Sequence, residues 1–122
     1  MRFRDYFTND FETGEHHYLP SLRTRYYRCR NEEAKEAVLR VIKEEKGEVK
    51  AILDEHNEIF FHAPQYTSTI TVISTRYSET AIDIKITTYK LFPMGYGKKI
   101  IERIYKKLDS ILPFKGVSLY KE

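Results

Sequence analysis

The sequence has little of what stabilises secreted proteins or anchors membrane proteins. Its 122 residues include one cysteine, Cys29, so no disulfide can form within the chain. The longest uncharged run, residues 59–75, contains His62, Pro64 and several threonines, so it is too short and too polar to span a bilayer. The opening MRFRDYFTND has no apolar segment of the kind that a signal peptide needs. We therefore expect a soluble cytoplasmic protein without a membrane partner.

Tryptophan is also absent, but ten tyrosines and seven phenylalanines are present. The length fits one domain with a modest core. The net charge of +3 is unevenly spread, because residues 96–122 hold seven Lys and Arg against three Asp and Glu, whereas residues 32–95 hold eight against eleven. Many ordinary domains are this basic, so charge alone does not indicate a nucleic-acid partner.

Two segments show the spacing of amphipathic helices. The first is predicted over about 32–46, with Asn31 as the N-cap and Gly47 after its end. Its apolar positions are Ala34, Ala37, Val38, Val41 and Ile42. The second is predicted over about 98–112 and is stopped by Pro113; its apolar positions are Ile100, Ile101, Ile104, Leu108 and Ile111.

Five segments have the character of strands. They read LRTRYYRCR, EVKAILDE, IFFHA, YTSTITVISTRY and AIDIKITTYKLF. In the last, isoleucines at 82, 84 and 86 alternate with polar residues, which indicates one buried and one solvated face. The pattern predicts an irregular leader over 1–21 and a single α+β domain over 22–122. That domain has two helices on one face of a five-stranded antiparallel sheet, and the tail FKGVSLYKE adds at most a short extended piece.

The element order resembles a known arrangement. Strand, helix, four strands and helix, with the passages EEAKEAVLRVIKEEKGEV and GYGKKIIERIYKKLD, resemble the helix-grip or TATA-binding-protein-like fold over about residues 22–112. The chain is similar to small domains of the outer-membrane assembly lipoprotein BamC, to several uncharacterised bacterial families, and to small cytosolic proteins of unknown function from Gram-positive bacteria. The resemblance implies a fold and supplies no catalytic residue.

The stretch FPMGYGKK invites comparison with a phosphate-binding loop. A Walker loop needs a glycine five positions before its Gly-Lys pair and a hydroxyl residue directly after it. Counting from Gly97 and Lys98, these positions hold Phe92 and Lys99. Both requirements fail, so the segment is interpreted as the flexible start of the second helix, and no nucleotide cofactor is expected.

No other pattern indicates catalysis or metal binding. His16 and His17 are adjacent, and neighbouring side chains on an extended chain point to opposite sides. Cys29 lies between Arg28 and Arg30, but no histidine is placed to act as its base. The carboxylates follow helix and turn surfaces. We therefore expect a non-enzymatic protein with no metal and no cofactor.

The solvated face of the sheet is the first candidate site. We predict that it binds a protein or small ligand through His62, Tyr77, Lys85 and Tyr89. Phe60 and Ile73 also fall on this face and are unusually apolar for one that meets only water. Two alternatives stay open: the leader covers this face, or a second copy pairs with it. We expect a monomer or a weak homodimer.

A nucleic-acid site is the second candidate. Interleaved arginine and tyrosine can hold phosphates and stack on bases. The residues involved would be Arg23, Arg25, Tyr27, Lys99, Arg103 and Lys106.

Overall fold

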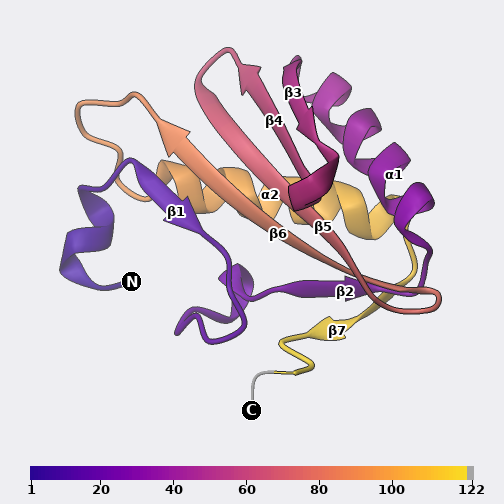
Figure 1. Ribbon diagram of the computed structural model, residues 1–122. Helices are drawn as coiled ribbons and strands as arrows, with labels where there is room; N and C mark the ends of the chain where they lie inside the picture. The colour runs from indigo at the N-terminus through magenta and orange to yellow at the C-terminus, as the bar shows by residue number, and fades with distance from the viewer. Residues whose placement is uncertain (121–122) are drawn as a thin grey trace.

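Residues 1–120, which the computed structural model describes, fold into an antiparallel sheet with two helices packed on one face (Figure 1). The helices are α1 (Asn31–Glu44) and α2 (Tyr96–Ile111). Three short 3-10 helices are η1 (Phe3–Tyr6), η2 (Pro20–Leu22) and η3 (Asp54–His56). The strands are β1 (Asp10–Glu12), β2 (Arg25–Tyr27), β3 (Glu48–Leu53), β4 (Glu58–Ala63), β5 (Tyr66–Arg76), β6 (Glu79–Thr88) and β7 (Phe114–Val117).

The sheet has seven strands in this part of the chain, so the prediction of five is wrong. Their order is β3-β4-β5-β6-β2-β7, and β1 also pairs with β6. The ten-residue β6 accepts both short partners along one edge, β2 at residues 80–82 and β1 at residues 85–87. Strands of three or four residues are too short to show a period in the sequence, which is why β1 was missed and β7 was expected only as a short extended piece.

The two helices and their amphipathic pattern are confirmed. Ile82, Ile84 and Ile86 of β6 are buried beneath them, and Ile104 of α2 is fully buried against this layer. The N-terminal cap of α1 differs from the prediction. The cap residue is Arg30, and the Asn31 side chain instead donates a hydrogen bond to the Val72 carbonyl, at 3.2 Å.

The leader is not irregular throughout, because Asp10–Glu12 form β1. The ring of Phe11 is buried and lies against Gly97, where an added Cβ would come within 2.8 Å of it. Gly97 therefore serves close packing, and Gly95, with φ at +77°, turns the chain into α2. The leader thus extends the sheet beyond β6, which leaves the face opposite the helices open along β4, β5 and β6 (Figure 1).

Candidate functional site on the open sheet face

Strand register aligns polar side chains in rows across the open face. One row contains Glu58, Thr71 and Asp83. The next row contains Phe60, Thr69, Lys85 and Glu12, and the third contains His62, Thr67, Thr87 and Asp10. Residues of one row come from different strands and lie directly opposite one another, so their side chains are within reach of a shared ligand.

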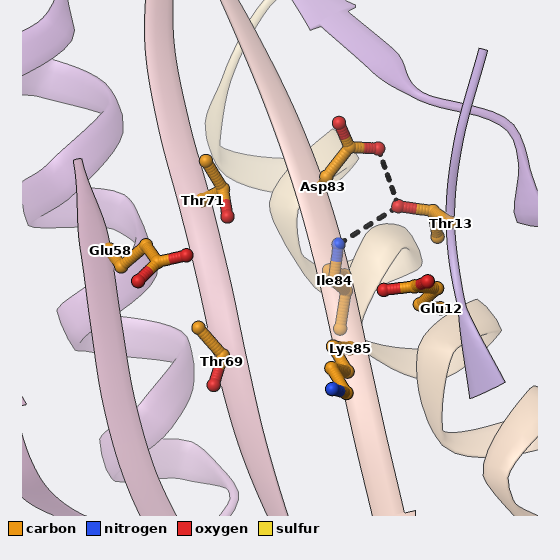
Figure 2. Close-up of a pocket in the computed structure, with 8 residues that line it drawn as sticks. All are labelled: Glu12, Thr13, Glu58, Thr69, Thr71, Asp83, Ile84 and Lys85. Carbon is orange, nitrogen blue, oxygen red and sulfur yellow. Dashed lines mark hydrogen bonds between the residues drawn. The ribbon is translucent and has the colours of Figure 1, made fainter. Parts of the chain in front are cut away.

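A hollow of about 210 Å³ lies where the first two rows meet. Figure 2 shows its lining residues, which are contributed by four strands and the residue after β1: Glu12, Thr13, Glu58, Thr69, Thr71, Asp83, Ile84 and Lys85. Two further hollows continue along the face, and Lys85 lines all three. Together they form a trough, which we call the open-face trough. It is centred on Lys85, with three carboxylates in its first hollow.

Asp83 is the most constrained of these carboxylates. Its Oδ1 accepts hydrogen bonds from the hydroxyls of Thr13, at 2.6 Å, and Thr24, at 2.7 Å. Thr13 is itself held on β6, because its hydroxyl accepts from the Ile84 amide at 2.9 Å (Figure 2). Burial raises the pKa of Asp83, and the two threonine hydrogen bonds only partly oppose that rise. The trough therefore holds a carboxylate whose charged form is disfavoured.

The four predicted ligand residues are not brought together. Lys85 is at the centre of the trough, and His62 lies on the same face one row away, edge-on to Phe60. Tyr77 lies in the turn before β6 and Tyr89 follows its last residue, so the ten residues of β6 place these tyrosines roughly 30 Å apart. A single small ligand cannot contact both.

Sequence reasoning did not select the acidic residues of this site. Asp83 was visible only as one member of an alternating polar face, and Glu58 looked like a surface charge in a turn. Glu12 and Thr13 belonged to a leader without a period. Their convergence depends on strand register, for which the sequence alone gives no direct signal.

Four of the six predicted nucleic-acid residues are engaged within the protein. Arg25 pairs with Asp109 at 2.7 Å and lies over the Phe114 ring. Tyr27 is fully buried and donates a hydrogen bond to the same Asp109, so its ring cannot stack on a base. Arg103 is bound to Glu45.

Arg23 is the fourth engaged residue. The guanidinium of Arg23 donates to the carbonyl of His17, at 2.9 Å. Lys99 and Lys106 are exposed, and neither forms an ion pair within residues 1–120.

Glu45 is a buried carboxylate between the helices. It accepts a hydrogen bond from Tyr66 at 2.7 Å, a salt bridge from Lys107 at 2.6 Å and a bidentate contact from Arg103. Burial alone would raise the pKa of Glu45, but these three partners outweigh it and lower the pKa to about 2. Part of the predicted basic face of α2 therefore neutralises an internal charge.

The fold places two other candidate residues, Cys29 and His17, in local contacts with Thr80 and Leu19. The Cys29 thiol is buried, and burial raises its pKa, which disfavours a nucleophilic thiolate. Within residues 1–120, no three His, Cys, Asp or Glu side chains gather in a way that could hold a metal ion. No helix in this same part of the chain has the length and apolar character to cross a membrane.

No protein-family model, curated protein or solved structure matches this chain.

Proposed function

We propose that the protein is a small non-enzymatic binding module that holds a polar ligand in the open-face trough. The observation that carries this proposal is the cluster of Glu12, Glu58, Asp83 and Lys85 around one hollow, on a face that no helix within residues 1–120 covers. We include in the proposal the cytoplasmic location expected from the sequence.

The environment of Asp83 supports a functional role for it. A carboxylate whose pKa is raised by burial makes folding less favourable at neutral pH. Residues that cost stability are found preferentially at functional sites, because binding needs charges that folding alone would remove. Asp83 also ties Thr13 and Thr24 to β6 through two hydrogen bonds, and ligand binding would be a second role for the same carboxylate.

The charge of the hollow indicates the kind of ligand. Three carboxylates face one lysine, so the lining favours a cation over an anion. Threonines 13, 69 and 71 add hydroxyls that can donate or accept hydrogen bonds. The acidic first hollow, at about 210 Å³, is below the roughly 300 Å³ at which pockets for drug-sized molecules begin, although the third hollow of the trough reaches about 400 Å³. A small molecule that carries ammonium and hydroxyl groups fits these features best.

The test is an amide NMR titration with contrasting small probes. Ethanolamine and spermidine represent the cations, and inorganic phosphate and citrate represent the anions. We expect the cationic probes to shift the amides of Thr69, Thr71 and Asp83, whereas the anions leave them unmoved. Asp83→Asn and Glu58→Gln should each weaken binding by on the order of tenfold, because each removes one charge-assisted contact.

Glu36→Gln is the matched control, since Glu36 is an exposed carboxylate on α1, on the other side of the sheet. Equal weakening in this control would mean that overall charge attracts the probes. Absence of any shift at the trough with either cation would refute the proposed ligand class.

The nucleic-acid alternative has less support, because four of its six residues already form hydrogen bonds or ion pairs within the protein. It predicts retention on heparin that falls steeply as salt rises. The trough proposal predicts no such retention, so heparin chromatography distinguishes the two proposed functions.

A further inference from the structure

Large apolar side chains are exposed together at the end of the molecule where β6 stops. Leu91 is 87% exposed, Phe3 80% and Phe92 69%. We call this surface the apolar tip; it consists of Phe3, Phe7, Tyr89, Leu91, Phe92 and Met94. Side chains exposed to this extent project into solvent. Single exposed apolar residues are ordinary, but six on two adjoining segments mark an interaction surface.

Hydrogen bonds join the two segments of the tip. The amide of Met94 donates to the Tyr6 carbonyl at 2.8 Å. The Asn9 side chain and the Lys90 backbone exchange two hydrogen bonds, at 2.9 and 3.1 Å. Figure 1 shows the leader and the loop between β6 and α2 at the same end of the molecule. The tip is therefore one surface built from residues more than eighty positions apart in the chain.

Basic side chains outnumber acidic ones around the tip. Arg2, Arg4, Lys90 and Lys99 are exposed and form no ion pair within the described residues 1–120. Across residues 1–9 and 89–99 the sole acid is Asp5. Its carboxylate accepts hydrogen bonds from the Tyr18 hydroxyl and the Arg2 amide. Asp5 and Asp10 lie beside Arg4, so the apolar centre has a rim with a net excess of positive charge that is only partly compensated.

We propose that the apolar tip docks on an anionic lipid bilayer. Leu91, Phe92 and Phe3 enter the boundary between headgroups and acyl chains, and the basic rim contacts the lipid phosphates and carboxylates. This pairing of partial insertion with electrostatic attraction is how peripheral proteins hold to membranes. A projecting surface suits a bilayer, whereas a protein partner would need to offer a matching groove. The sequence expectation of no membrane partner rested on the lack of a spanning segment, which does not bear on peripheral docking.

Co-sedimentation with vesicles tests the proposal. Phosphatidylcholine vesicles containing phosphatidylserine should sediment the protein, and pure phosphatidylcholine should do so much less. The double variant Leu91→Ser, Phe92→Ser should reduce the partition constant about tenfold or more, because it removes the inserted apolar area. Arg4→Gln and Lys99→Gln should each reduce it about fivefold and weaken its dependence on salt. All four residues are exposed, so the fold should be kept.

Tyr77→Ser is the matched control, since Tyr77 is an equally exposed ring at the opposite end of β6. Failure of the wild-type protein to sediment with the mixed vesicles would overturn the proposal, as would equal loss in the Tyr77 variant. A lipid-free dimer in analytical ultracentrifugation, lost in the double variant at positions 91 and 92, would assign the tip to a second copy instead. The amine titration of the trough is a separate readout, so the two proposals fail independently.

Discussion

Removing the charge of Glu45 should destabilise the protein less than removing the two cations that neutralise it. The Glu45 side chain is 2% exposed, whereas those of Arg103 and Lys107 are 45% and 29% exposed. In Glu45→Gln the cations can turn to water, and the new amide oxygen can still accept from Tyr66. In a double variant with methionine at 103 and 107, the carboxylate stays buried with only the tyrosine hydroxyl.

The magnitudes follow from the pKa and from burial. The folded-state pKa of about 2 lies well below the ordinary 4.5, and each pKa unit is worth about 1.4 kcal/mol. After a reduction for the solvent around Arg103, Glu45→Gln should cost about 2–3 kcal/mol at pH 7. An unpaired buried charge costs more, about 3–5 kcal/mol, which is the expected effect of Arg103→Met with Lys107→Met.

The pH dependence separates the two variants further. In the wild type the stabilisation from ionised Glu45 is complete above pH 4.5 and is lost as the pH falls towards 2. Glu45→Gln should lack this acid sensitivity. In the double methionine variant burial dominates and raises the pKa of Glu45 above its unfolded value. Its stability should therefore increase as the pH falls from 7 and the carboxylate becomes protonated.

Urea unfolding at pH 7 and pH 5 would measure both effects. Lys106→Met on the same helix is the control, since Lys106 is exposed and should cost no more than about 0.5 kcal/mol. The reasoning is refuted if the double variant is more stable than Glu45→Gln at pH 7, or if its stability falls between pH 7 and pH 5.

Three other substitutions test the fold and the trough. Ile104→Ala should lower the free energy of unfolding by about 2–5 kcal/mol, because Ile104 is fully buried. Lys106→Ala should change it by less than about 0.5 kcal/mol. Equal effects of the two substitutions in urea unfolding would mean that the buried and exposed faces of α2 are misassigned. Gly97→Ala should cost about 1–3 kcal/mol by displacing the Phe11 ring, and a double-mutant cycle should show that this cost shrinks in Phe11→Leu. Asp83→Asn should raise stability at pH 7, since the raised pKa of Asp83 makes its ionised form a cost to folding; the gain should vanish below about pH 3.8. No gain in chemical denaturation at pH 7 would contradict that assignment.

Periodic segments were predicted well because their signal is local. In β6 the alternation at positions 82, 84 and 86 identifies the buried face, and the same face packs beneath α2. The apolar arc of α2 likewise identifies Ile104 as core. Both patterns arise because regular backbone repeats its direction every 2 or 3.6 residues, so one face of each element must meet either water or the core.

The candidate site could be predicted only in part. Lys85, one of the predicted ligand residues, lines the trough, and it could be placed on this face because it lies on the solvated side of a strongly alternating strand. Tyr77 and Tyr89 were grouped with Lys85 because the alternation of side chains along a strand shows which face a residue occupies. It does not show how far apart two residues lie along that face. Arg103 was assigned to a nucleic-acid surface because the pattern of a single helix cannot reveal its contact with Glu45, which lies 58 positions away in the sequence.

The sequence by itself determined the α+β class, the two amphipathic helices and the alternation of the long strands, because these depend on neighbours within a few residues. Only the tertiary structure decided which strand meets which, and with that the pairing of Thr13 with Asp83, 70 positions apart, and of the leader with the loop after β6. Such contacts bring together side chains from segments that are individually featureless. Their geometry is set by strand register and by the packing of Phe11 on Gly97, which no local pattern encodes.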